Sequence, residues 1–230
     1  MGRIADMAGR VYGGISSTDR QSTRRAALLD AALDVIAEDG VTAVTVRGVC
    51  GRARLADRYF YENFSDRDAL LDGLADELFT QVGGALLAAI TAASTSGSAT
   101  ADPAAVARAG VETAIAFVTE DPRRGRLLVE ARGSAALQQH LDQAVRVLAT
   151  LTATQASDLL GERAPSPQDT DMAAFTLVSG GLELLRHWLC GELAVSRHQL
   201  TEFLIAMFVT TTDLATALAA TLASTGPDTA

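Results

Sequence analysis

The chain has 230 residues, of which 48% are hydrophobic and 5% aromatic, and its formal net charge is −9. This length suits one large domain or a small domain joined to a larger one. The acidity argues against a chain that binds nucleic acid over its whole surface. Helix-forming residues dominate, only five prolines occur, and no long alternation of Val, Ile, Thr and Tyr is present, so we expect an all-α protein.

The charges are distributed unevenly along the chain. Residues 1–68 contain ten Arg and ten acidic residues, whereas residues 69–230 contain nine Arg and eighteen acidic residues. A neutral, arginine-bearing N-terminal part on an acidic body fits a protein that contacts DNA with one end only. Acidic surfaces also serve solubility alone, so the pattern permits DNA binding without requiring it.

The N-terminal segment predicts an arm and a first helix. Residues 1–20 hold four glycines and show no helical period, which indicates a flexible arm. A helix is expected from Ser22, with an apolar stripe that includes Leu29 and Leu33, and Gly40 is its C-terminal stop.

Residues 45–64 predict two short helices with a tight joint between them. Thr45 is placed to cap the first helix, and the second carries Arg58, Tyr59 and Tyr61 within four residues. Arginine and hydroxyl-bearing aromatic side chains on a short helix can hold phosphates and reach base edges. The segment is therefore interpreted as a helix-turn-helix whose second helix enters the DNA major groove.

The rest of the chain predicts further helices. Ser65, with Asp68 in capping-box register, starts a helix that runs to about Thr91. Asp102 and Asp121 are each followed by Pro, as is typical of an N-cap before the first helical position. A small-residue linker is expected at residues 94–100, and the later helices at about residues 103–119, 122–131 and 134–160, followed after a loop by two long final helices.

The two final helices carry an apolar seam. On the first of them, five apolar residues from Phe175 to Leu189 follow one another at steps of 3, 4, 3 and 4. Such a seam packs against a partner helix. Helix-turn-helix proteins usually bind two half-sites as dimers. We expect a four-helix bundle across a two-fold axis; the alternative is that the stripe faces the chain's own core. The expected dimer residues are Phe175, Val178, Gly181, Leu182, Leu185, Phe203 and Met207.

A family resemblance is carried by three segments, which together span about residues 22–71. They are R-R-x-x-L-L-D-A-A-L from Arg24, T-V-R-x-V from Thr45, and Y-F-Y-E-N-F-S-D-R-D-A-L from Tyr59. This pattern resembles the TetR family of bacterial transcriptional regulators, and the arm V-Y-G-G-I-S-S-T-D-R is similar to an extension common in actinobacterial members. The resemblance implies about nine helices, a homodimer, and a small-molecule ligand that changes DNA affinity. It divides the chain into a flexible arm (residues 1–20), a three-helix DNA-binding head (residues 21–66) and a helical ligand-binding and dimerisation body (residues 67–225).

The resemblance also assigns roles to single residues. Thr45 and Tyr61 match phosphate-binding positions, Arg67 stands where the family usually has Lys, and Asn63 replaces a common His. Arg54 lies where the family usually has Gly in the turn, so that turn must be strained or altered. The candidate DNA-binding residues are Arg24, Thr45, Arg47, Arg54, Asp57, Arg58, Tyr59, Tyr61, Asn63 and Arg67.

Several of these residues have two readings. Arg58 either reads guanine or holds a phosphate. Asp57 is either a carboxylate favoured by the helix dipole or an acceptor from cytosine, and we favour the first. Tyr59 contacts DNA or packs with its hydroxyl outward. Arg24 and Arg47 are phosphate clamps or solvated surface residues.

The body is rich in Ala, Leu and Val, so we expect a mainly apolar cavity with one or two polar anchors. The candidate ligand residues are Glu130, His140, Glu183, His187 and Trp188. For His140 a surface or satisfied core position is the more common case, and for Trp188 core or dimer packing is favoured. The ligand is expected to be apolar or aromatic.

Other classes of function lack a supporting pattern. No local catalytic signature, Gly-rich phosphate loop or metal-ligand spacing is visible, so we expect no enzyme, cofactor or metal site. No signal peptide is visible, and the uncharged stretch at residues 78–101 is too rich in Ser, Thr and Gly in its second half to span a membrane, which indicates a cytoplasmic protein. The sequence predicts a dimeric repressor released from double-stranded operator DNA by a mainly apolar ligand. The alternative is a helical ligand-binding or scaffold protein that has lost DNA binding.

Overall fold

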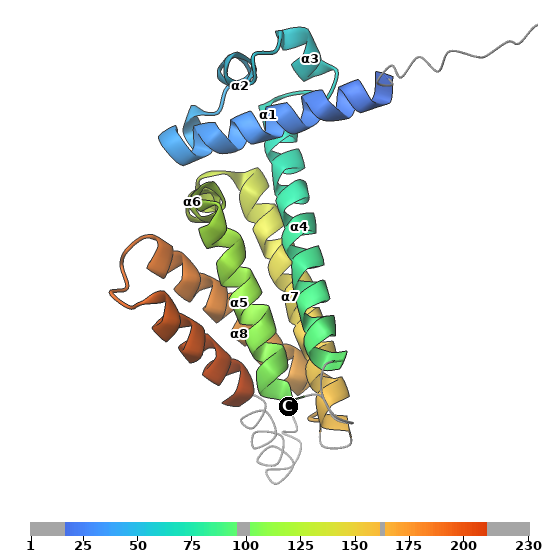
Figure 1. Ribbon diagram of the computed structural model, residues 1–230, viewed down its shortest axis with the longest axis vertical. Coiled ribbons are helices and arrows are strands. Elements are labelled where there is room, and N and C mark those ends of the chain that lie inside the picture. The colour runs from blue at the N-terminus through green and yellow to red at the C-terminus, as the bar shows by residue number, and fades with distance from the viewer. Residues whose placement is uncertain (1–16, 96–101, 162–163, 211–230) are drawn as a thin grey trace, which may run out of the picture.

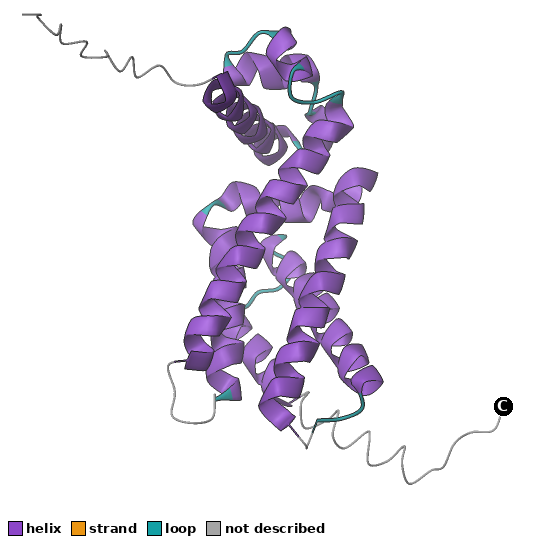
Figure 2. Ribbon diagram, turned by 90° about the vertical axis from the view of Figure 1, so that its right-hand side faces the viewer, coloured by secondary structure: helices purple, strands orange, loops and turns teal. Residues whose placement is uncertain are grey.

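The computed structural model describes residues 17–95, 102–161 and 164–210, and the described chain is all-α. It contains nine α-helices and two 3₁₀ turns, with no strand in the described ranges (Figure 2). They are α1 (Ser17–Asp39), η1 (Val41–Ala43), α2 (Val46–Ala53), α3 (Asp57–Tyr61), α4 (Arg67–Thr95), α5 (Pro103–Glu120), α6 (Pro122–Glu130), η2 (Ala131–Gly133), α7 (Ala135–Leu160), α8 (Pro167–Leu189) and a last helix over residues 197–210. The predicted fold class is confirmed. Residues 1–16 of the expected arm and most of the linker lie outside the described residues.

The head consists of α1, α2 and α3, and α1 lies across the end of the body (Figure 1). Its core is built from residues with no exposed surface, including Leu28, Ile36 and Phe60. Leu70 and Leu71, in the first turns of α4, complete the same core and are also fully buried. The head is therefore packed onto the beginning of a helix that continues into the body.

The helix ends follow local chemistry that the sequence predicts in most places. Gly40 ends α1 with φ of 84°, a conformation that favours glycine. The side chains of Asp102 and Asp121 accept from the backbone N–H groups of Ala104 and Arg123, which confirms both N-caps. Before the last helix, Ser196 and Gln199 form the predicted capping box.

Three predicted boundaries are wrong. The first helix begins at Ser17, five residues before the predicted start, and α4 continues to Thr95. The cap of α4 is Asp66, whose Oδ1 accepts from the backbone N–H of Ala69 at 2.8 Å, and not Ser65. A carboxylate at this position satisfies the free N–H and also interacts favourably with the helix dipole, which a hydroxyl does not.

The body surrounds an apolar interior formed by α4, α5, α7, α8 and the last helix. By length and composition alone, α4 could cross a membrane, and it is the one helix in the described ranges that could. Its apolar side chains nevertheless have partners inside this chain. Leu74 and Leu78 belong to the head core, and Leu78 and Leu86 also line the body's cavity.

Candidate DNA-binding surface and ligand cavity

The joint between α2 and α3 has the geometry of a tight helix-turn-helix. Thr45 caps α2, with its Oγ1 accepting from the N–H of Gly48 at 3.1 Å. Arg54 ends α2 in the left-handed region, with φ of 55° and ψ of 40°, and the N–H of Leu55 donates to the Cys50 carbonyl at 3.0 Å. Arg54 is the one non-glycine residue with positive φ in the described ranges, which confirms that this turn tolerates a residue other than Gly.

The short helix α3 presents a polar, aromatic face to solvent. Phe60 points inward with no exposed surface, whereas Tyr61 is 62% exposed. Two guanidinium groups contact the Tyr59 ring, with the Cζ atoms of Arg24 and Arg58 both 4.6 Å from its centroid. Arg58 also donates from Nη2 to the Tyr59 hydroxyl at 2.6 Å. Arg24, Arg58 and Tyr59 therefore form one cationic, stacked group, which we call the arginine–tyrosine stack.

Three further observations concern candidate DNA residues that already have partners inside the head, namely Arg67, Asn63 and Arg24. Arg67 donates from Nε and Nη2 to the carbonyls of Val44 and Val41 at 2.9 and 2.8 Å, so it holds η1 in place. Asn63 donates to the Tyr59 carbonyl at 2.7 Å, and Arg24 forms an ion pair of 3.4 Å with a carboxylate, that of Glu62.

Asp57 begins α3, where the helix dipole favours a carboxylate.

Burial raises the pKa of the Cys50 thiol, and the nearby Asp57 carboxylate raises it further. Cys50 is buried, whereas Cys190 at the end of α8 is exposed. Arg47 and Arg54 are exposed on the turn side of the head, as a phosphate contact requires.

A mainly apolar cavity of about 600 Å³ lies inside the body. Side chains of α4, α5, α7, α8 and the last helix line it, including Phe79, Val111, Leu148 and Phe208. Of the five predicted ligand residues, His140 lines this cavity. Its Nε2 is 3.1 Å from the Asp76 carboxylate, and its ring stacks on Phe79 at 6.5 Å between centroids.

The other four predicted ligand residues lie elsewhere. Glu130 accepts from the Val41 N–H at 3.4 Å and so joins the body to the head. Glu183 and His187 belong to a charged cluster on α8, where hydrogen bonds from Arg186 hold the pKa of Glu183 below its usual range. Trp188 donates from Nε1 to the Val195 carbonyl at 2.9 Å, which is a packing role.

Arg124 is a cavity residue that sequence reasoning missed. It lies in the run Pro122-Arg123-Arg124-Gly125-Arg126, which has the appearance of a solvated basic cluster. The fold separates the three arginines: Arg123 pairs with the head, Arg126 pairs with Glu130 at 2.8 Å, and Arg124 lines the cavity. No signal in the sequence distinguishes these three positions.

The expected dimer residues fall into two groups. Val178, Gly181, Leu182 and Leu185 line the chain's own cavity. Phe175 and Phe203, by contrast, are 50% and 55% exposed, and Met172, one turn before Phe175 on α8, is 57% exposed. Met207 is half-buried. Part of the stripe therefore packs inside the chain. The exposed Met172, Phe175 and Phe203, which we call the uncovered apolar face, lie on α8 and the last helix.

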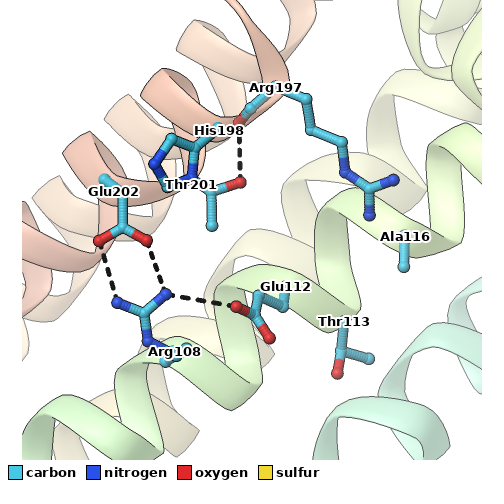
Figure 3. A pocket seen from close by; sticks show the side chains of 8 residues that line it. All are labelled: Arg108, Glu112, Thr113, Ala116, Arg197, His198, Thr201 and Glu202. Carbon is cyan, nitrogen blue, oxygen red and sulfur yellow. Dashed lines mark hydrogen bonds and ion pairs between the residues drawn. The ribbon is translucent and has the colours of Figure 1, made fainter.

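A polar groove lies between α5 and the last helix (Figure 3). Arg108 donates from Nη1 and Nη2 to the two carboxylate oxygens of Glu202 at 2.6 and 2.9 Å, and Nη1 also reaches Glu112 at 3.3 Å. This bidentate pair holds the pKa of Glu202 below its usual range and fixes the last helix against α5.

Comparisons with known proteins agree with this architecture. Residues 28–74 match the profile of the bacterial regulatory proteins, tetR family. No curated protein gives a significant sequence match. The fold is similar to a transcriptional regulator from Pseudomonas aeruginosa PAO1, with 18% identity, a TM-score of 0.70, and coverage of 88% of this chain and 99% of that one.

Two further solved structures show the same similarity. A TetR-family transcriptional regulator from Syntrophomonas wolfei strain Goettingen has 15% identity, a TM-score of 0.69, and coverage of 84% of this chain and 96% of that one. The transcriptional regulator FadR from Bacillus subtilis, in complex with stearoyl-CoA, has 17% identity, a TM-score of 0.63, and coverage of 83% and 97%. The head thus contains a segment that matches the bacterial regulatory proteins, tetR family, and the described residues share the fold of solved TetR-family transcriptional regulators.

Proposed function

We propose that this chain is a cytoplasmic, dimeric repressor that binds operator DNA through α3 and releases it when a mainly apolar ligand enters the body cavity. One observation carries the proposal. The helix α4 contributes Leu70, Leu71 and Leu74 to the head core and lines the cavity from Ala75 onward. Any shift of α4 caused by a ligand must therefore move the head.

The exposed surface of the head supports DNA binding. The arginine–tyrosine stack presents the guanidinium of Arg24 from α1 and that of Arg58 from α3 beside the Tyr59 phenol. Arg47 on α2 and Tyr61 on α3 are also exposed. Arginine can bind guanine in bidentate fashion, and the remaining groups suit phosphate oxygens. Of the two arginines in the stack, Arg24 is paired with the Glu62 carboxylate, whereas Arg58 has no carboxylate partner among the described ion pairs. Arg58 is therefore assigned the base contact.

The uncovered apolar face supports a dimer. Met172 and Phe175 on α8 and Phe203 on the last helix are each at least 50% exposed. Gly180 on α8 has no atom within 4 Å of the position where a Cβ would lie, so a partner helix could approach closely there. Large apolar side chains left exposed on two adjacent helices are typical of a protein interface.

The cavity supports a mainly apolar effector. Its volume of about 600 Å³ lies in the range of small-molecule sites, and its lining is mostly aliphatic. The B. subtilis relative was solved with stearoyl-CoA, which has a long apolar chain. A ligand that binds the DNA-free arrangement more tightly than the DNA-bound one would release the operator.

Selection of bound sequences from a random DNA pool tests the DNA-binding claim. A dimeric reader is expected to enrich two half-sites about one helical turn, roughly 34–36 Å, apart. Affinity for the selected sequence should fall steeply with salt, because phosphate contacts release counterions. Arg58→Ala should cost about 1–3 kcal/mol and relax base preference at one position. Arg146→Ala, an exposed arginine on α7, is the matched control and should have no effect.

A helical ligand-binding protein without DNA affinity is the second candidate. The head has no net charge over residues 1–68, and Arg67 and Arg24 already have partners inside it. Failure to enrich any sequence, with no saturable binding to DNA upstream of the chain's own coding region, would favour this candidate and refute the repressor proposal.

A further inference from the structure

The cavity wall is mainly apolar, with a few neutral polar side chains, among them Gln143, Thr152 and Gln155. Its ionisable lining residues, within the described part of the chain, are Asp76, Arg124 and His140. His140 lies 3.1 Å from Asp76, so these two groups have each other as partners. Arg124, on the first turn of α6, is the one permanently cationic group in the described wall.

Arg124 has unused hydrogen-bonding capacity. Its Nη1 donates to the Phe117 carbonyl at 3.3 Å, and its Cζ lies 4.4 Å from the centroid of the Phe117 ring. Its Nε is buried and has no hydrogen-bond partner among the described residues. A buried donor on a charged group is costly to leave unpaired, which indicates that an acceptor belongs beside it.

The nearest carboxylate does not supply that acceptor. Asp121 lies 4.0 Å from Arg124 Nε, beyond hydrogen-bond distance. Both Asp121 oxygens are already engaged by Arg123, whose Nε and Nη2 donate to them at 2.9 to 3.2 Å. The backbone N–H of Arg123 also donates to Asp121 Oδ1. Within the described ranges the Arg124 Nε therefore has no acceptor, and the residue itself lines the cavity.

The shape of the cavity limits which ligand can carry an acceptor for Arg124. Its α4 wall runs from Ala75 to Ile90, a span of about 22 Å at 1.5 Å per residue. Between these ends the α4 wall is nearly all apolar, and the facing residues of α5 include Val106, Val111 and Ile115. A long, narrow apolar space with a cation at one end matches an amphiphile.

We infer that the cavity binds a long-chain carboxylic acid, with the carboxylate on Arg124 and the chain along α4 toward Ile90. This inference rests on the proposed function, because it names the class of effector that the body cavity takes. Arg124 is the specificity-determining residue, since it distinguishes an acid from a neutral molecule with the same chain. A charge-assisted hydrogen bond in an apolar site supplies that discrimination.

Displacement of the neutral dye Nile red from the full-length protein, without DNA, tests the inference. Lauric acid is expected to displace the dye at a concentration at least about tenfold lower than methyl laurate requires. Methyl laurate has the same chain without the negative charge. Arg124→Gln should weaken the binding of lauric acid by roughly 10- to 100-fold and leave the affinity for methyl laurate unchanged. Arg124→Lys should restore part of the lost affinity, and Arg146→Gln, outside the cavity, should match the wild type.

Three outcomes would overturn the inference: equal affinity of acid and ester, equal weakening of both by Arg124→Gln in a variant that melts like the wild type, or no displacement by either probe. The failure of the inference is distinguishable from that of the proposed function. Binding of lauric acid by a protein that selects no DNA refutes the repressor alone, whereas operator binding without acid binding refutes the ligand class alone.

Discussion

Arg123 on α6 and Asp34 on α1 are joined by an ion pair of 2.6 Å from Nη1 to Oδ1, which connects the body directly to the head. The same guanidinium reaches Asp30 at 2.9 Å and holds Asp121 through two of its nitrogens. One arginine thus binds three carboxylates, two of them on the helix that crosses the end of the body (Figure 1). Because Arg124 follows it directly, α6 contacts the cavity with one arginine and the head with the other.

Replacement of Arg123 by Gln is expected to loosen this connection. The variant loses charged hydrogen bonds to both Asp30 and Asp34, so the free energy of unfolding should fall by about 1–3 kcal/mol. The effect of ligand on operator affinity should also shrink, because α6 no longer transmits its position to α1. Thermal melts measure the first effect, and operator titrations with and without ligand measure the second.

Arg108→Gln is the matched control for this experiment. Arg108 also makes a bidentate ion pair, with Glu202, but both residues lie within the body (Figure 3). It should lower stability without changing the effect of ligand on DNA affinity. An Arg123→Gln protein that keeps its full ligand response would show that α4 alone transmits the signal.

The Asp121 carboxylate should make stability depend on pH. Hydrogen bonds from Arg123 hold the pKa of Asp121 below its usual value, with a further contribution from the charge of Arg124. Because the folded pKa is lowered, this stabilisation is complete above the unfolded pKa of about 3.9 and is lost as the pH falls through the lower folded value.

Asp121→Asn isolates this effect, since Asn also caps helices but carries no charge. The variant should be less stable than the wild type at pH 7, and the difference should shrink as the pH falls below about 4. Urea unfolding at several pH values measures it. A difference that stays constant with pH would mean that the loss comes from the cap and not from the charge.

The sequence predicts the framework well because the relevant rules are local. Asp102 and Asp121 before Pro, Gly40 after an apolar stripe and Thr45 before Val46 each specify a helix end by their own hydrogen bonds or backbone preference. The predicted cap of α4 was wrong because Asp66, one residue further on, accepts from the N–H of Ala69, and a carboxylate is the stronger acceptor. The Ser65 hydroxyl instead donates to the Asp66 carboxylate.

The cavity residues could not be predicted in the same way. His140 and Glu130 both lie on amphipathic helices, yet one lines the cavity and the other binds η1 in the head. The adjacent arginines Arg123 and Arg124 likewise have opposite surroundings. These outcomes depend on how helices from distant parts of the chain are rotated against one another, and periodicity does not specify that rotation.

Arg54→Gly should stabilise the head and weaken DNA binding at once. The left-handed backbone of Arg54 costs a residue with a Cβ about 1–2 kcal/mol, and glycine avoids most of this cost. Loss of the exposed guanidinium should remove one phosphate contact and reduce the salt dependence of DNA affinity by about one counterion. Chemical denaturation and DNA titrations over a range of salt concentrations measure the two effects. Lower stability of the variant would show that the Arg54 side chain makes contacts worth more than the strain.

Phe203→Ser should dissociate the proposed dimer. Phe203 is 55% exposed in the single chain, and burial of an aromatic side chain at the centre of an interface commonly contributes about 2 kcal/mol or more. The variant should therefore sediment as a monomer at concentrations at which the wild type is a dimer, and it should lose the high-affinity contact with paired half-sites while its helical content is retained. Leu87→Ser is the matched control, because Leu87 is 58% exposed but lies on α4, away from α8 and the last helix. If both variants remain dimers, the uncovered face of α8 and the last helix is not the interface, and the exposed Phe175 and Met172 need another explanation.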